Sequence, residues 1–214
     1  MRLIACLTTL LIAPAMHAQT IVLDDFDSNP NDEAGGPREL SSTINFNPYN
    51  QSSSFEVLTG FTLDDIAGAV VFNSGIGVEH TGIINWDNNG AGLNLDAAAL
   101  GLVGFELDFL QIDQMFEIGI LLETFGAANA SASLTSKIGP ALSPKTFSFS
   151  AGDFSFQENF DLSDVDSVTI TFNSESMNTP SLDFILTEFR AVVPSPASAA
   201  LLGLGGLVAT RRRR

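Results

Sequence analysis

The stretch Gly104–Leu110 reads GFELDFL, and a second stretch shortly after it, Met115–Glu123, reads MFEIGILLE. In the first stretch, apolar side chains at Phe105, Leu107 and Phe109 alternate with polar or acidic ones. Successive side chains of a strand point to opposite faces, so a period of two predicts strands with one face buried and one in water. A helix would place its apolar residues three or four positions apart. The pattern therefore favours an all-β fold.

The same alternation recurs along much of the chain. The other inward-facing sets that we predict are Phe116/Ile118/Ile120/Leu122, Phe147/Phe149, Phe154/Phe156, Val168/Ile170/Phe172 and Leu182/Phe184/Leu186. Turn signals such as Asn88–Gly90 and Asn178–Pro180 separate these segments, and helix is indicated only as one turn at Asp96–Leu100. We predict a single antiparallel β-sandwich, and a jelly roll because the terminal stretches IVLDDF and LDFILTEFR are long enough to pair.

The N-terminus has the layout of a secretory signal peptide. One positive residue, Arg2, precedes an apolar run over Leu3–Ala15 and then small residues, which predicts cleavage after Ala18. The only cysteine, Cys6, leaves with this peptide. The mature chain is then expected to have no disulfide, no thiolate metal site and no cysteine nucleophile.

The region between the two ends is strongly acidic. All 25 Asp and Glu residues lie between Gln19 and Val193, against four basic residues, which gives this region a net charge of −21. Because phosphate groups would be repelled rather than neutralised, nucleic acid is excluded as a partner. Divalent cations, neutral polysaccharide and simple solvation stay open as explanations of the charge.

The C-terminus ends in an apolar segment followed by four arginines. The segment 197–210 carries no charge and predicts a helix of roughly 21 Å. Four positive charges behind it resist translocation, so the expected topology has the domain outside the membrane and the arginines on the cytoplasmic side. The residues of this predicted sorting motif are Val193, Pro194, Ser195, Pro196, Arg211, Arg212, Arg213 and Arg214.

This tail resembles the PEP-CTERM sorting tail of Gram-negative and related bacteria, with Ser195 in place of the family's usual glutamate. The resemblance implies export, transient membrane anchoring, and processing by an exosortase-like enzyme toward the cell surface or extracellular matrix. The part from Gly82 to Leu100 and the closing strands are similar to uncharacterised exported bacterial proteins that carry this tail. We expect a signal peptide over 1–18, a β-sandwich domain over 19–190 and a sorting tail over 191–214.

One acidic segment, DDFDSNPNDE at Asp24–Glu33, is the candidate metal site. Calcium takes six to eight oxygen ligands, which closely spaced carboxylates and amides can supply. The predicted calcium ligands are Asp24, Asp25, Asp27 and, from the closing strand, Asp183. The alternative is a solvated acidic turn, since Pro30 stands where an EF-hand loop would need glycine.

Two aromatic residues, Trp86 and Tyr49, are the candidate sugar-binding residues. An exposed indole beside Asn and Asp would stack on a sugar ring, whereas a buried indole would simply fill the core. The one histidine of the mature region, His80, has no accompanying motif for a catalytic triad and too few companions for a catalytic zinc. Spacing alone identifies no pair of glycosidase carboxylates among so many acidic residues.

Three functions follow, in order of preference. The first is a non-enzymatic, exported cell-surface or matrix protein with a structural or adhesive role, whose partners are the export machinery and an exosortase-like enzyme. The alternative is a carbohydrate-binding module on a jelly roll, which binds extracellular polysaccharide; no cofactor is established for it, and calcium is the one candidate. A glycoside hydrolase is a distant third.

Overall fold

The computed structural model describes residues 18–27, 37–59, 68–125, 129–174 and 176–194. Nearly all of the expected signal peptide and the tail beyond 194 lie outside the described residues, and so does the expected apolar helix over 197–210. Among the residues that are described, no helix is long and apolar enough to cross a membrane. One compact unit extends over Thr20–Val193.

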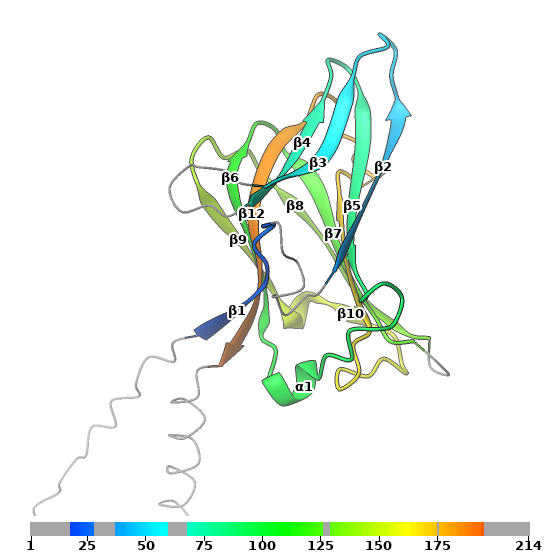
Figure 1. Ribbon diagram of the computed structural model, residues 1–214, viewed down its shortest axis with the longest axis vertical. Helices are drawn as coiled ribbons and strands as arrows, with labels where there is room; N and C mark the ends of the chain where they lie inside the picture. The colour runs from blue at the N-terminus through cyan, green and yellow to red at the C-terminus, as the bar shows by residue number, and fades with distance from the viewer. Residues whose placement is uncertain (1–17, 28–36, 60–67, 126–128, 175, 195–214) are drawn as a thin grey trace, which may run out of the picture. The chain divides into compact units, whose positions relative to one another are not determined.

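Two antiparallel sheets form a β-sandwich, as predicted (Figure 1). In the first sheet the strand order is β3-β4-β12-β6-β9, and β1 pairs with β12 beside this path. This pairing confirms the prediction that the two terminal strands of the domain lie together. The strands are β1 (Ala18–Asp24), β3 (Ser53–Thr59), β4 (Gly68–Ser74), β6 (Gly104–Ile112), β9 (Lys145–Ser150) and β12 (Asp183–Pro194).

The second sheet has the strand order β10-β8-β7-β11-β5-β2. Its centre is a row of buried isoleucines, in which Ile170 of β11 is paired with Ile120 of β7 on one side and Ile84 of β5 on the other. The strands are β2 (Arg38–Phe46), β5 (Glu79–Trp86), β7 (Phe116–Glu123), β8 (Ser131–Ile138), β10 (Ser155–Phe156) and β11 (Ser167–Phe172).

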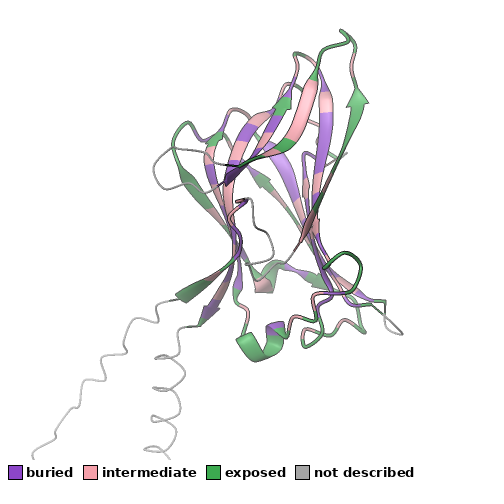
Figure 2. Cartoon of the chain, in the orientation of Figure 1, coloured by how far each residue is buried: buried purple, intermediate pink, exposed green. Residues whose placement is uncertain are grey.

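The core between the sheets is rich in phenylalanine. Figure 2 shows that buried residues recur along the strands of both sheets. The ring of Phe184 stacks on Phe72 at 4.8 Å and on Phe116 at 5.3 Å, and it meets Phe172 of the opposite sheet at 5.0 Å between centroids. The predicted inward residues of β6, β7, β11 and β12 are buried, which confirms those assignments. The prediction for Phe156 was wrong: it is 48% exposed, because it belongs to a two-residue strand at the sheet's edge.

Two short helical turns interrupt the strands. The turn predicted at Asp96–Leu100 is α1 (Ala97–Leu100), and η2 (Ala151–Asp153) follows β9. The Asp96 carboxylate caps α1 by accepting a hydrogen bond of 2.7 Å from the Ala99 amide. Gly101 ends the helix at φ 66°, a left-handed conformation that glycine adopts without strain.

Several connections gather at one end of the sandwich (Figure 1). We call this the loop end, and it comprises residues 47–52, 75–78, 113–115, 139–144 and the described part of 173–182. Strand β12 begins there with Asp183 and runs to the other end of the unit, where Val193 leads into the C-terminal tail of the sequence.

Candidate functional site: an aromatic surface at the loop end

The loop end carries large apolar side chains that are open to solvent. Tyr49, in the connection between β2 and β3, is 66% exposed. Phe46, at the end of β2, and Ile76, between β4 and β5, are exposed as well. We call the group Phe46, Pro48, Tyr49 and Ile76 the Tyr49 platform. In the residues that the structure describes, no other tyrosine or tryptophan is exposed.

The loop under Tyr49 is closed by two of its own polar residues. The Asn47 side-chain amide donates to the carbonyl oxygen of Gln51 at 2.8 Å, and the Gln51 backbone amide donates back to Asn47 Oδ1 at 2.9 Å. Asn50 between them has φ 53°, a left-handed conformation in which asparagine is favoured. Tyr49 is therefore presented by a loop whose shape is fixed before any ligand arrives.

Gly77 supports one side of the tyrosine ring. A Cβ atom at Gly77 would lie 3.0 Å from Tyr49 Cε2, so the glycine backbone itself approaches the ring. The Gly77 amide donates to Ser181 Oγ at 2.7 Å, and the Ser181 amide donates to the Val78 carbonyl at 3.0 Å. These contacts join three connections of the loop end.

The loop under Tyr49 carries no charge, although Glu79 of β5 is paired with Phe46 at the border of the platform. The run Leu40–Phe55, which includes the loop, contains no charged residue. Nearby in the fold, Asp113 Oδ1 accepts from the Asp183 amide at 2.8 Å, and Asp183 Oδ1 accepts from the Ser74 amide at 3.0 Å. Burial raises the pKa of Asp183; the hydrogen bond from Ser74 opposes this effect and the charge of Asp113 adds to it. The Asp183 carboxyl group is thus fixed beside β4 by its hydrogen bond from Ser74.

Trp86 does not belong to the site. Its side chain is only 1% exposed, and its indole Nε1 donates to Asp24 Oδ2 at 2.8 Å. The ring packs against Phe189 with centroids 5.0 Å apart. The expectation that Trp86 stacks on sugar is corrected by its burial. The indole fills the core next to a turn, the second of the two readings that the sequence left open.

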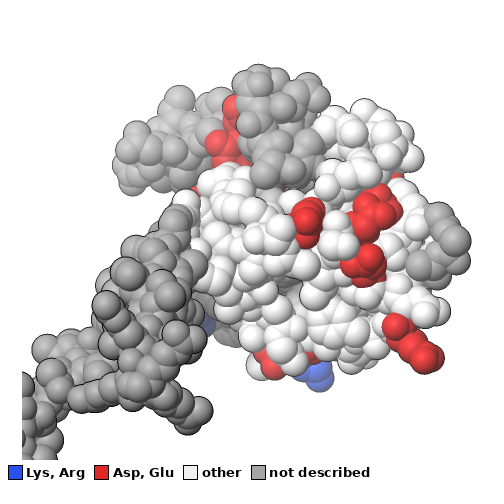
Figure 3. Space-filling model, turned by 90° about the horizontal axis from the view of Figure 1, so that it is seen from below, with Lys and Arg blue, Asp and Glu red and all other residues white. Residues whose placement is uncertain are grey.

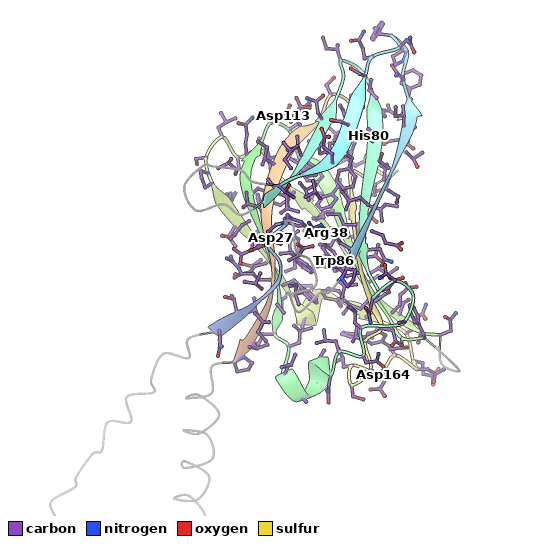
Figure 4. All side chains as sticks on the ribbon, viewed as in Figure 1. Asp27, Arg38, His80, Trp86, Asp113 and Asp164 are labelled. Atoms are coloured by element: carbon purple, nitrogen blue, oxygen red, sulfur yellow. The ribbon has the colours of Figure 1, made fainter. Side chains whose placement is uncertain are left out.

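Asp24 is likewise committed to internal contacts, which corrects the expected calcium site. Its Oδ1 accepts from Arg38 Nη1 at 2.6 Å and from the Phe26 amide at 2.7 Å, while Oδ2 accepts from Trp86. Figure 4 shows Arg38, Trp86 and Asp27 close together in the middle of the sandwich. The Arg38 guanidinium already neutralises this carboxylate, so a metal cation could bind it only by breaking the ion pair.

The other predicted ligands do not join Asp24 in a cluster. Asp25 Oδ1 accepts from the Asp27 amide at 3.0 Å, and Arg38 Nη2 donates to the Asp27 carbonyl at 2.6 Å. Asp183 lies at the loop end, where β4 rather than β1 borders β12. Among the described residues, no group of three His, Cys, Asp or Glu side chains could hold a metal ion. Residues 28–33 of the predicted segment lie outside the described residues.

His80 is a core residue of β5. It is buried, and its imidazole stacks on Phe72 with centroids 4.7 Å apart. Burial lowers the pKa of His80, so the imidazole is neutral in the folded protein at pH 7.

A cluster of carboxylates on the outer face of the first sheet surrounds Arg190. The guanidinium lies 2.7 Å from Asp108, 3.2 Å from Glu106 and 3.3 Å from Glu188. Burial raises the pKa of Glu188, and the charge of Arg190 opposes that effect. This cluster is an ion-pair network on a partly solvated sheet face.

Of the site, the sequence identified Tyr49 and missed its supports. Asn47, Gln51, Ile76 and Gly77 were not singled out. The dipeptide Asn47-Pro48 is a turn signal that indicates an exposed loop. The contact of Gly77 with Tyr49 joins segments far apart in the chain, and no local pattern reveals it.

No protein-family model matches the chain, and no curated protein sequence matches it. Solved structures do. One is the family 11 carbohydrate-binding module from Clostridium thermocellum in complex with a β-1,3-1,4-mixed-linked tetrasaccharide, with TM-score 0.50, 13% identity, and coverage of 80% of this chain and 94% of that one. Another is the solution structure of CtCBM11, with TM-score 0.50, 13% identity, and coverage of 86% and 99%. At such identities the likeness concerns the fold, which is a two-sheet sandwich of the jelly-roll type.

Proposed function

We propose that the unit Thr20–Val193 is a non-enzymatic carbohydrate-binding domain that holds neutral polysaccharide at the Tyr49 platform. The observation that carries the proposal is the Tyr49 ring, which is 66% exposed, backed by Gly77 and fixed by the Asn47–Gln51 bridge. The C–H face of a sugar ring packs on an aromatic face, and a preformed ring loses little entropy when it binds. The fold shared with a module solved in complex with a tetrasaccharide supports the same reading.

Neutral rather than anionic polysaccharide suits this surface. The domain carries 25 acidic residues against four basic ones, so a polyuronate or sulfated chain would be repelled. The loop itself is uncharged, and its side-chain amides hold its shape: Asn47 donates to the Gln51 carbonyl and Gln51 donates to the Tyr49 carbonyl. Hydrolysis of a glycosidic bond would need a pair of carboxyl groups, one on each side of the bond that is cut. The platform is aromatic and apolar, which is suited to binding.

The proposal is tested by changing the ring. We expect Tyr49→Ala to weaken binding to a soluble mixed-linkage β-glucan or mannan by about tenfold or more, as truncation of a central aromatic anchor does. Tyr49→Phe keeps the stacking face and should stay within a few fold of the wild type. The measurement is affinity electrophoresis in gels that contain each neutral polysaccharide, with a polyuronate gel for comparison.

The matched control is Leu142→Ala, which removes another exposed apolar side chain from the loop end but leaves the platform intact. It should bind like the wild type. Equal binding by Tyr49→Ala and the wild type would remove the platform from the site. A wild-type protein that is retarded by none of the neutral polysaccharides would contradict the function itself.

We also propose that this domain is exported and held at the cell surface or in the matrix, where binding of polysaccharide gives it an adhesive role. The support is the sequence of Met1–Ala18 and of Val193–Arg214, with its resemblance to an exosortase-processed tail. Protease added to intact host cells should cleave the domain, and serine at Arg211–Arg214 should disturb its display. Full-length protein in the cytosol, with Met1–Ala18 still attached, would contradict export.

A further inference from the structure

Strand β2 forms one edge of the second sheet, and it is unusually open. Its neighbour on one side is β5, and within the described residues no strand pairs with its other side. All six residues of Ser41–Phe46 are exposed (Figure 2). They include Ser42 and Ile44, which belong to the inward row because they are paired with the buried Gly82 and His80 of β5. Of these two, Ile44 is 48% exposed. In the part of the chain that the structure describes, no backbone hydrogen bond to another strand occupies this edge.

Strand β2 is protected only near its two ends, by the exposed Glu39 and by a register shift after Ile44, which leaves Leu40–Ile44 uncharged and regular between them. Proteins block exposed edges with charges, with short strands or with bulges, because an open edge is a template for another strand. Here β10 has only two residues, β3 carries Glu56, and β9 begins with Lys145. In β2 the guanidinium of Arg38 turns inward to Asp24, and Leu40–Phe46 is uncharged.

The absence of charge points to a second copy of the same chain as the occupant. Two domains of net charge −21 repel each other over most of their surfaces. They approach at least cost where the surface carries no charge, and Leu40–Phe55 is the longest run without charge in the unit Thr20–Val193. The register shift between Ile44 and Phe46 limits the regular part of this edge to the residues up to Ile44.

We propose that two copies associate through β2, paired antiparallel around a twofold axis at Ser42. In this register Leu40 of each copy faces Ile44 of the other on the inward row, and Ser41 faces Thr43 on the outward row. Apolar pairs and Ser–Thr pairs are favourable cross-strand neighbours. Glu39 lies opposite the irregular segment after Ile44 of the other copy, so the two Glu39 carboxylates do not face each other. The contact is isologous, as a twofold dimer requires.

The test is sedimentation velocity of the full chain over a range of concentration. Ser42→Lys and Ser42→Asp each place like charges directly opposite each other at the twofold axis, and each should weaken self-association severalfold. An equal mixture of the two variants should associate at least as well as the wild type, because Lys then faces Asp. Added salt should strengthen the wild-type dimer by screening the repulsion between the acidic domains.

The matched control is Ser133→Lys, the same change at an exposed position of β8, which is enclosed by β7 and β10. It should leave the dissociation constant unchanged. A wild type that stays monomeric at all concentrations overturns the proposal, as does a mixture of the Ser42 variants that associates no better than either alone. Tyr49→Ala should dimerise normally, so the outcome is separate from that of the sugar-binding test.

Discussion

At the scale of the residue, the most consequential side chain is the fully buried Asp24. It belongs to β1 of the first sheet, and its carboxylate binds Arg38 and Trp86, which are paired residues of β2 and β5 in the second sheet. A buried carboxylate is tolerated only when it is paired and hydrogen-bonded. This contact therefore ties the two sheets together. It also explains the single wrong assignment of an aromatic ligand, because the Asp24–Trp86 bond joins residues 62 positions apart.

We expect Asp24→Ala to lower the free energy of unfolding by about 3–5 kcal/mol, because it leaves the Arg38 charge buried without its partner. Trp86→Phe loses one hydrogen bond to a charged group and should cost less, about 1.5–3 kcal/mol. The double variant Asp24→Asn, Arg38→Met should lose less stability than the sum of the losses in the single variants Asp24→Asn and Arg38→Met. Urea unfolding measures all of these.

The control for these variants is Asp164→Ala, which removes an exposed carboxylate at the end of the unit opposite the loop end (Figure 4). It should change the free energy of unfolding by no more than about 0.5 kcal/mol. If Asp24→Ala proved no more harmful than Asp164→Ala, the buried ion pair would not hold the sheets together. Additive single and double variants would show that the two groups act independently.

At the scale of the element, alternation in the sequence was a reliable guide to several strands that bury one face, but β4 and β5, which also bury side chains, were not predicted from it. The strands β6, β7, β11 and β12 each show an apolar row, and each is a strand with that row inside. Strand β2 was not predicted, because both of its faces are largely exposed and burial imposes little pattern on its sequence. The ring of Phe156 was misplaced for a related reason: a two-residue edge strand does not close over it.

Two glycines within strands should respond very differently to alanine. At Gly104 of β6 a Cβ atom would lie 2.1 Å from the carbonyl oxygen of Phe149 in β9, so the pairing of these strands must shift. At Gly119 of β7 the nearest atom would be 3.7 Å away, an ordinary contact. We expect Gly104→Ala to destabilise by about 2 kcal/mol or more. Gly119→Ala should be neutral or stabilise by about 0.4–1 kcal/mol.

Thermal or urea unfolding of the two alanine variants makes the comparison, since each serves as the control for the other. The same loss of stability in both would mean that strand glycines matter here for a general reason and not for the close approach of β6 to β9.

At the scale of the whole molecule, charge and sequence ends were the parts that could be analysed without a structure. The composition shows an acidic chain, and Figure 3, which views the unit from the end opposite the loop end, shows acidic side chains spread over the described surface. Spacing alone could not distinguish a calcium site from an internal ion pair at Asp24, because closely spaced carboxylates suit both. Only the fold shows that Asp24 points at Arg38 and that Asp183 lies elsewhere.

Strand β12 has a mechanical consequence. It begins at Asp183 at the loop end and ends at the opposite end of the unit, where the sequence continues into the C-terminal tail after Val193. A pulling force between a ligand held at Tyr49 and the residues after Val193 would therefore act along the axis of β12. Its twelve residues are bonded to β6 over most of their length, to β4 near Asp183 and also to β1. Such a force loads these hydrogen bonds in shear, all together, instead of peeling them apart one at a time.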